Sequence, residues 1–562
     1  MKKLLACLIF ACCVAVTFAQ EKLPFTKGLN MLGWFAVWEE NALPDLSRYD
    51  EADFACLKSM GVDVMRLTVH FDLLMEPAYT GRIYDSVLEK LDQVCDWAEK
   101  YQIYLVIDNH AFNTEQWDNN PPSVDYYVEH LKNAWSQVAP RYKDRSEYII
   151  YEIVNEPKGT EEYRNKWAKK QQELIDLIRE YDATRPIVVT SADWGNIDTL
   201  VKTKPYKDPN LIYTFHFYEP HIFTHQGASW VSDEVEDLEG LPFPYDKKRL
   251  PKLKGRTKNS WVQWEIENNY KIQGTEKFID NRIKKVANWA KKNKVKIWCG
   301  EIGAKVWTNP VDRLAWIRAT VSSLNKYDVP YCIWGIGGSD GFLKEDSETM
   351  IFPDDIDKEA LEAYGFKMPD ETLAAKCNSS LKQFPQKSYL VYDGYCGKGT
   401  SLNVYGSVRA VTLNDSHKEC VTVTLPGKNN NGCNYTLPKI IWNKIANNKD
   451  SCSISMSVKF TNKNQKFSIG LNDSDEGEVA LPWTREYEIR ASDYKSGEWV
   501  NIELPLSKFY ETGAWSNKTK KWYPSEGKFD WNRLELLQLY FNDFENAMSG
   551  EIYVDDIMIK KK

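Results

Sequence analysis

Residues 148–157 read Tyr-Ile-Ile-Tyr-Glu-Ile-Val-Asn-Glu-Pro, an apolar run that ends on a polar cluster. The run has the length and composition of a buried strand. Pro157 closes it, because proline cannot donate a hydrogen bond to a sheet ladder. Asn155 and Glu156 therefore stand at the mouth of a strand. A carboxylate there is held on rigid backbone and partly withdrawn from water, as proton transfer requires.

A second carboxylate occupies the same kind of position later in the chain. The segment 295–300 is again strand-like, and Glu301 follows it directly. We expect Glu156 and Glu301 to face each other across one site.

Segments of strand and helix character alternate from Phe25 to about Gly365. Eight such units predict a (β/α)8 TIM barrel, an α/β fold with a closed parallel sheet. The alternative is an open doubly wound sheet, which needs a glycine-rich loop after the first strand; Gly28 and Gly33 do not supply one. The eight predicted strands are residues 25–33, 62–69, 103–109, 148–154, 187–192, 211–217, 295–300 and 331–336.

The pattern changes after the barrel. Residues 20–365 form the predicted barrel domain, and the mixed, polar residues 366–385 are interpreted as a linker. From 386 to 562, apolar residues alternate with period two between clusters of Gly, Asn, Ser and Asp, which indicates an all-β sandwich. At 562 residues the chain is too long for one core, in agreement with this division.

The N-terminus has the pattern of a secretory signal. Two lysines precede an apolar stretch, and small residues suit cleavage after Ala19, so residues 1–19 are interpreted as a signal peptide and the protein as secreted. A lipid anchor on Cys12 is the less favoured alternative, because Phe10 is bulky for a lipoprotein signal. No other segment is long and apolar enough to span a bilayer. The net charge of −8, without a basic block, argues against a nucleic-acid partner.

Export also permits disulfides. Cys396, Cys420, Cys433 and Cys452 crowd the C-terminal part, where we expect two bridges of undetermined connectivity.

Polar and aromatic residues recur at the predicted carboxyl ends of the barrel strands, where barrel active sites lie. Burying so many polar groups without partners would cost several kcal/mol, so their convergence indicates a site. Two glutamates on one rim suit glycoside hydrolysis. Metal binding is the rival interpretation, although an arginine on the rim would repel a cation. The candidates beside the two glutamates are Arg66, His110, Asn155, Trp194, His216, Tyr218 and Trp334.

The ordered motifs resemble glycoside hydrolase family five, the cellulase family of the clan A barrels. The resemblance covers about residues 25–365. It is carried by Asp63–Leu67, Val106–His110, Val154–Pro157, His216–Pro220, Gly300–Gly303 and Trp334.

The resemblance implies a retaining double displacement without a cofactor. Glu156 would be the acid/base and Glu301 the nucleophile, and Asn155 would bind the sugar 2-hydroxyl. Arg66 and Tyr218 would keep Glu301 ionised. The remaining candidates would line the cleft: His110 and His216 along it, Trp334 as its floor, and Trp34 and Trp194 as further stacking platforms, with core packing as the alternative for each tryptophan.

The C-terminal part resembles jelly-roll carbohydrate-binding modules, chiefly in residues 551–559. The resemblance implies a structural calcium, for which Asp393, Asp555 and Asp556 are candidates; a solvated turn is the alternative.

We therefore expect a secreted, monomeric endo-β-1,4-glucanase that acts on cellulose or a related β-glucan polysaccharide. A mannanase, xylanase or β-1,3-glucanase of the same fold is the first alternative. A non-catalytic glycan-binding protein is the second, and the intact glutamate pair argues against it.

Overall fold

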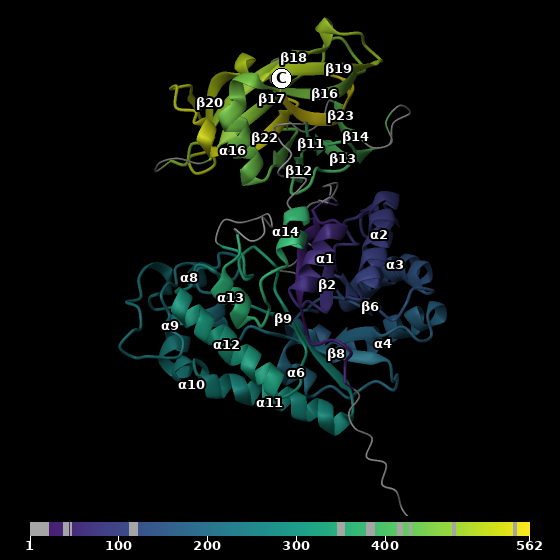
Figure 1. Ribbon diagram of the computed structural model, residues 1–562, viewed down its shortest axis with the longest axis vertical. Coiled ribbons are helices and arrows are strands. Elements are labelled where there is room, and N and C mark those ends of the chain that lie inside the picture. The colour runs from purple at the N-terminus through teal and green to yellow at the C-terminus, as the bar shows by residue number, and fades with distance from the viewer. Residues whose placement is uncertain are drawn as a thin grey trace, which may run out of the picture.

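The computed structural model describes residues 22–37, 44, 46, 48–111, 122–344, 355–377, 388–412, 417, 420–425, 430–474, 479–542 and 548–561. The predicted signal segment, with Cys12 and Ala19, lies outside these residues. Figure 1 shows a helix-wrapped barrel and, beyond α14, a second unit built mainly of strands.

Eight parallel strands close the barrel in the order β1-β10-β9-β8-β7-β6-β5-β2. All eight predicted strands are confirmed, and their bounds differ from the prediction by at most three residues. The strands are β1 (Lys27–Phe35), β2 (Val64–Val69), β5 (Tyr104–Asn109), β6 (Ile149–Glu152), β7 (Ile187–Thr190), β8 (Leu211–Phe217), β9 (Lys296–Ile302) and β10 (Tyr331–Ile333); the short hairpin β3 (Met75–Glu76) and β4 (Arg82–Ile83) lies outside the barrel.

The amino end of the barrel is filled with apolar side chains. Seven of the strands, and Phe25 two residues before β1, each contribute one buried side chain to a common cluster. The barrel is thus a packed core rather than a pore, and polar residues are left to its carboxyl end. The cluster consists of Phe25, Val64, Val106, Ile150, Val188, Ile212, Trp298 and Cys332.

Helices cover the outside of the barrel, as α11 and α12 do in Figure 1. Their starts are capped: Thr160 and Thr275, for example, accept backbone N–H groups of the first turn of α4 and α11. The helices are α1 (Glu51–Ser59), α2 (Asp85–Tyr101), α3 (Val124–Tyr142), α4 (Glu161–Tyr181), α5 (Ala192–Gly195), α6 (Ile197–Leu200), α11 (Glu276–Asn293), α12 (Pro310–Lys326) and α13 (Lys358–Ala363).

The long segment between β8 and α11 is elaborated with short helices. Tyr270 is buried and donates to the carbonyl of Pro242, which ties this segment together. Its helices are α7 (His221–Thr224), α8 (Asp233–Glu236), α9 (Trp261–Glu265), a π-helical turn (Ile266–Tyr270) and α10 (Lys271–Gln273).

The segment interpreted as a linker is helical in its first part. Helix α14 (Glu371–Cys377) packs on α1, and the thiol of Cys377 donates to the carbonyl of Ala52 at 3.0 Å. Lys398 of the second unit lies 3.0 Å from Asp50 and 3.1 Å from Asp53 of α1. The first half of the predicted linker is therefore part of the barrel unit, and residues 378–385 lie outside the described residues.

The second unit consists of two antiparallel sheets, so the predicted all-β sandwich is confirmed. Rings from facing sheets meet in its interior; those of Phe460 and Phe467 are 6.0 Å apart. One sheet contains β11 (Tyr389–Tyr392), β13 (Val408–Thr412), β14 (Cys420–Leu425), β16 (Cys452–Phe460), β19 (Trp499–Pro505) and β23 (Gly550–Lys561). The other contains β12 (Ser401–Tyr405), β15 (Gly432–Thr436), β17 (Lys466–Asp473), β18 (Trp483–Arg490), β20 (Tyr510–Ser516), β21 (Lys521–Pro524) and β22 (Leu534–Tyr540).

Two features of this unit differ from expectation. The helix α16 (Lys439–Asn448) interrupts the strands, because Ile441, Trp442 and Ile445 follow helical spacing and are buried. Cys433 and Cys452 are free buried thiols, so the two expected disulfides are not formed. These cysteines lie on strands of opposite sheets and serve as small apolar core residues.

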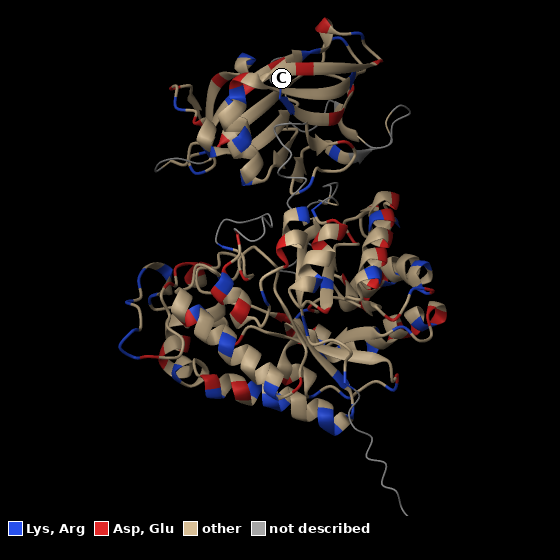
Figure 2. Ribbon diagram, in the orientation of Figure 1, with Lys and Arg blue, Asp and Glu red and all other residues tan. Residues whose placement is uncertain are grey.

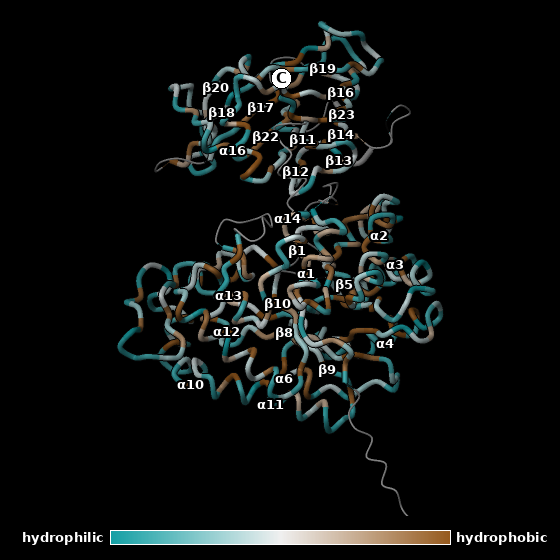
Figure 3. Tube along the Cα trace, viewed as in Figure 1, coloured by the Kyte–Doolittle hydropathy of each residue, from teal (hydrophilic) through white to brown (hydrophobic). Residues whose placement is uncertain are grey.

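Charged residues of both signs are interspersed over the helices, as Figure 2 shows. Figure 3 shows hydrophilic residues on the outlying loops, for instance around α10. None of the helices in the described part of the chain combines the length and apolar character that crossing a membrane requires.

Candidate active site

Glu156 and Glu301 meet at the carboxyl end of the barrel. Glu156 follows β6 by four residues, and Glu301 is the penultimate residue of β9. A carboxylate oxygen from each glutamate and a ring nitrogen of His216, on β8, all lie within 4.8 Å of one another. The two carboxylates thus share one site, as the sequence predicts.

Arg66, on β2, connects the two sides of this site. Its Nη1 donates to Glu301 Oε1 at 2.8 Å, and its Nη2 donates to Asn155 Oδ1 at 2.9 Å. The opposite edge of the guanidinium is held by Glu152, which accepts from Nε at 2.7 Å and from Nη2 at 2.9 Å. Asp108 Oδ2 lies 3.1 Å from Nη2. A fully buried arginine is therefore fixed by its carboxylate partners and presents its remaining donors to the site.

The sequence interpretation assigned no role to Glu152. The signal was present, because Glu152 is two residues from Ile150 and so shares its inward face on β6. A charged residue on the inner face of a buried strand requires a partner. Nothing in the sequence identified Arg66 as that partner.

The environment separates the two glutamates chemically. Burial, opposed by Arg66 and Lys158, raises the pKa of Glu156 to about 7. Burial raises the pKa of Glu301 to about 7 as well, opposed by His216, Arg66 and Tyr218. Arg66 and the Tyr218 hydroxyl donate to its two oxygens at 2.8 and 2.9 Å, which favours the ionised form. Because Glu301 accepts from these two donors, the hydrogen bonds favour the carboxylate at Glu301 and the proton at Glu156.

His216 supports the same assignment. Its Nδ1 lies 2.5 Å from Glu156 Oε1 and 3.4 Å from Glu301 Oε1. Burial lowers the pKa of His216 to about 4, so the imidazole is neutral near pH 7. A neutral ring can accept the proton of a Glu156 carboxylic acid at Nδ1, which stabilises the acid form.

His110 is oriented by Asp108. Its Nδ1 lies 2.6 Å from Asp108 Oδ2, and its Nε2 lies 3.3 Å from Asn155 Nδ2. The carboxylate thus keeps the proton on Nδ1 and leaves Nε2 to accept from the amide. The His110 ring also stacks on the ring of Trp334, with centroids 5.7 Å apart. His110 therefore contacts both Asn155 and Trp334, the predicted floor of the cleft.

Trp194 packs on the loop that follows Glu156. Its ring is 49% exposed and its backbone N–H donates to the carbonyl of Pro157. Its φ of 54° lies in the left-handed region, where non-glycine residues are strained. Gly159 is required beneath it, because an added Cβ would come within 2.3 Å of the indole. The loop after β7 therefore holds a partly exposed indole against Gly159, three residues after Glu156.

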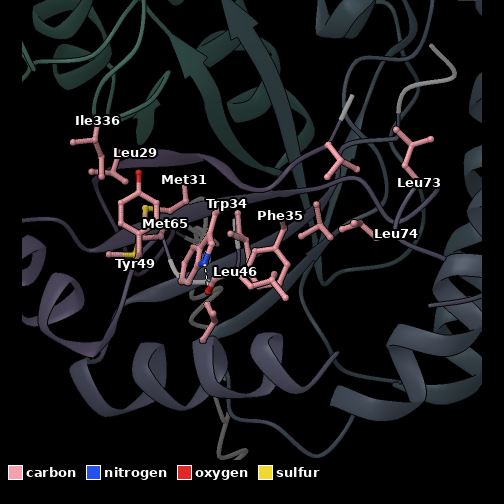
Figure 4. Packing of buried hydrophobic residues seen from close by; sticks show 14 of the residues in the cluster. Leu29, Met31, Trp34, Phe35, Leu46, Tyr49, Met65, Leu73, Leu74 and Ile336 are labelled. Carbon is pink, nitrogen blue, oxygen red and sulfur yellow. Dashed lines mark hydrogen bonds between the residues drawn. The ribbon is translucent and has the colours of Figure 1, made fainter. Parts of the chain in front are cut away.

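Trp34 does not line the site, contrary to expectation. It is completely buried, and its indole N–H donates to the carbonyl of Leu46 at 3.0 Å (Figure 4). The register of β1 shifts between Met31 and Phe35 and passes through Gly33 at φ 66°. That irregularity turns Trp34 outward, where it stacks on Trp97 beneath the helices.

One further sequence pattern lies near the site. Gly337–Gly341 read Gly-Gly-Ser-Asp-Gly, which matches the spacing of a serine-hydrolase nucleophile elbow. Such an elbow requires a strand, a sharp turn and a helix, whereas turns and bends follow β10 here. Ser339 Oγ donates to Asp340 and lies 3.1 Å from Lys305 Nζ. This serine has no histidine among its hydrogen-bond partners within the described chain, so it lacks a base.

The cluster at the glutamates is unfavourable for a cation, and the cluster in the second unit does not suit calcium. Arg66 contacts Glu301 and opposes a cation beside the two glutamates. In the second unit, His417 bonds to Asp555, and Asp556 accepts from Ser457 at 2.7 Å. These carboxylate oxygens are satisfied by protein donors and have an imidazole among them, whereas calcium prefers oxygen ligands. The donor set therefore does not fit the expected calcium.

The third calcium candidate, Asp393, is exposed. Although the residue is exposed as a whole, partial burial of its carboxyl, and to a lesser extent the charge of Asp556, raises the pKa of Asp393. Among the described residues, Asp393 does not belong to the group whose potential ligand atoms lie within 4.8 Å of one another.

Residues 26–340 match the family described as cellulase, glycosyl hydrolase family 5. Endoglucanase 3 of Fibrobacter succinogenes is 29% identical over 333 residues, which are 56% of this chain and 49% of that protein. The chain thus spans about half the length of that relative. Endoglucanase C of Acetivibrio thermocellus is 26% identical over 320 residues, 55% of this chain and 90% of that protein. A solved hyperthermophilic endo-β-1,4-glucanase, in complex with substrate, is 26% identical with a TM-score of 0.47 and covers 60% of this chain and 97% of that one.

Proposed function

The chain belongs to glycosyl hydrolase family 5, and from this premise we propose that it cleaves internal β-1,4 bonds of cellulose or a related β-glucan with retention of configuration. The observation that carries the proposal is the approach of Glu156 and Glu301: a carboxylate oxygen of one lies within 4.8 Å of a carboxylate oxygen of the other. Retaining enzymes hold their two carboxyl groups about 5–5.5 Å apart, which leaves no room for a water between them.

In the first step, Glu156 gives its proton to the oxygen of the leaving sugar while Glu301 attacks the anomeric carbon. The bond to the leaving sugar breaks and a glycosyl ester on Glu301 forms. In the second step, Glu156, now a carboxylate, takes a proton from water, which displaces Glu301. Because His216 bonds to Glu156, it can accompany both proton transfers as an acceptor or a donor.

The surrounding groups position this chemistry. Arg66 and Tyr218 hold Glu301 by one oxygen each, which leaves its carboxylate oriented for attack. Arg66 and His110 hold the side-chain amide of Asn155, and this amide would bind the 2-hydroxyl of the sugar. Trp334 offers an apolar ring for the flat face of the sugar.

The substrate is tested on a panel of carboxymethylcellulose, mannan, xylan and laminarin, with release of reducing ends as the readout. We expect activity on the first, in keeping with the relatives named endoglucanases. Activity on another polymer alone would replace the substrate and leave the chemistry intact. Proton NMR of the first product should show the β-anomer; the α-anomer would contradict the retaining mechanism.

The non-catalytic alternative is tested with Glu301→Gln, which keeps the size of the side chain. Turnover should fall by at least about 10⁴-fold while glycan binding persists, because the nucleophile is lost and the cleft is retained. Equal turnover in the variant and the wild type would exclude Glu301 as nucleophile.

For the C-terminal unit, glycan binding is the second part of the proposal. Trp515 and Trp522 face each other across β20 and β21 and are 45% and 49% exposed. Gly513 leaves room for the Trp522 ring, which a Cβ would approach to 2.9 Å. Retention of the Glu301→Gln protein on cellulose should drop when both tryptophans become alanine. Unaltered retention would assign the binding to the barrel alone.

Secretion is the third part, and it depends on the signal pattern of residues 1–19. N-terminal sequencing of protein recovered from the medium should begin at Gln20. A mature protein beginning at Cys12 and carrying lipid would favour the anchored alternative.

A further inference from the structure

Two exposed indoles stand together on the loops that follow β8 and β9. Trp230 is 60% exposed and Trp307 is 41% exposed. Their ring centroids are 6.1 Å apart and their planes are nearly perpendicular, at 80°. Two large apolar rings that form an open corner are costly to leave in water, and such patches mark binding surfaces.

Both rings are held in place from behind. The Nζ atom of Lys305 lies 4.7 Å from the centroid of Trp230, and this lysine is itself nearly buried and paired with Asp340 at 2.5 Å. The Trp307 Nε1 donates to the carbonyl of Gln226 at 2.7 Å. The corner is therefore preorganised, because its rings are fixed before any ligand arrives.

The loop beneath Trp307 also requires glycine. Gly227 has a φ of 80°, and a Cβ there would come within 2.6 Å of Trp307 Nε1. A close backbone approach of this kind leaves the indole little freedom to move toward the protein. The exposed part of the ring is thus a fixed surface.

Hydrogen bonds connect the loops of the corner to the catalytic site. Trp307 follows Glu301 by six residues on the same strand exit. Thr224 joins the two loops, since its hydroxyl donates to the carbonyl of Tyr218 at 2.6 Å and its carbonyl accepts from the N–H of Lys305 at 3.2 Å. Tyr218 in turn donates to Glu301. The connections that place the nucleophile therefore also place the corner.

We propose that Trp230 and Trp307 form an outlying subsite that binds a pyranose ring of the substrate chain, several sugars from the bond that is cleaved. This inference rests on the proposed function. A β-linked glucan is extended and unbranched, and the flat faces of its rings are apolar, so a chain leaving the cleft can place a ring in this corner.

The kinetic consequence is a dependence on chain length. Only substrates long enough to reach the corner gain from it, and short ones do not. Each tryptophan-to-alanine change should lower kcat/KM on a long soluble β-glucan roughly tenfold relative to kcat/KM on an aryl cellobioside, a typical loss for an aromatic residue that the bound ligand covers.

The control is Trp264→Ala. Trp264 is 58% exposed, on α9 in the same elaborated segment, and has no contact with the corner among those the structure describes. We expect the long-to-short ratio to fall in Trp230→Ala and Trp307→Ala and to stay at the wild-type value in Trp264→Ala. An unchanged ratio in the Trp230→Ala/Trp307→Ala double variant would overturn the proposal.

Two further measurements keep the outcome interpretable. Trp230→Phe and Trp307→Phe retain a ring, so they should recover much of the ratio if stacking is the cause and folding is intact. In the Glu301→Gln background, affinity for a long oligosaccharide should fall about tenfold when Trp230 becomes alanine. This binding assay does not depend on turnover, so its result stands even if the wild type cleaves a different polymer or none, in which case the proposed function fails separately.

Discussion

The change Glu152→Gln tests how the catalytic groups are held. Glu152 touches no substrate position. It binds Arg66 through two hydrogen bonds of 2.7 and 2.9 Å, and both side chains are at most 1% exposed. Glutamine has the same shape but carries one acceptor and no charge. In the variant, one Arg66 N–H would therefore face the NH2 group of the glutamine, and these two donors cannot form a hydrogen bond.

The loss of stability follows from these contacts. Breaking a buried ion pair by removing one partner costs about 3–5 kcal/mol. Asp108 and Glu301 still face the guanidinium at 3.1 and 2.8 Å, so we expect the lower end, about 3 kcal/mol in the free energy of unfolding.

The effect on activity follows from the other edge of Arg66. A shift of about 1 Å in the guanidinium would displace both Glu301 and Asn155, and misplacement on this scale costs about 100-fold in rate. We expect kcat to fall by about that factor while KM changes less. The charge of Glu152 also raises the pKa of Glu156. Removing it should move the alkaline limb of the pH profile to lower pH, which a purely structural role would not do.

The assays are denaturant unfolding and kcat/KM as a function of pH, with Asp182→Asn as the matched control. Asp182 forms a buried pair with Arg185 at 2.8 Å, away from the site. This control should lose comparable stability and keep its pH profile. If Glu152→Gln retained kcat within twofold and an unmoved alkaline limb, the claim that Glu152 positions Arg66 would be refuted.

Three other outcomes are expected. Because Glu156 must be protonated and has a pKa raised to about 7, kcat/KM should fall as pH rises above about 7, and a profile flat to pH 9 would exclude Glu156 as the acid. Tyr218→Phe removes a donor to ionised Glu301, so its pKa should rise, the acid limb should move to higher pH, and kcat/KM should drop about 10- to 100-fold; no shift would mean that the hydroxyl does not support the nucleophile. Lys398→Met removes the cationic partner of the buried Asp53 carboxyl. Burial already raises the pKa of this carboxyl to about 6. Thermal unfolding should show a loss of about 3 kcal/mol that grows as pH rises, because the unpaired group must ionise, and a pH-independent loss would contradict this.

Much of the barrel was predictable because local pattern carries the signal. Strands β8 and β9, for example, are short apolar runs whose penultimate residues are His216 and Glu301, and parallel strands place such ends on one rim. The prediction that Trp34 lines the cleft was wrong, and the cause is not visible in the sequence pattern. A register shift in β1 changes which side of the strand faces the site, and one residue of slip reverses every side chain after it.

Residue order alone was enough for the alternation of strand and helix, the carboxylates at strand ends and the sandwich that follows, because these depend on periodicities a few residues long. Closure of the barrel supplied the rest. Glu156 and Glu301 are 145 positions apart and meet only when eight strands complete a ring, and the same closure encloses Arg66 among Glu152, Asp108 and Glu301. Proton affinity in this site is a property of that enclosure, since burial and neighbouring charge act through space rather than along the chain.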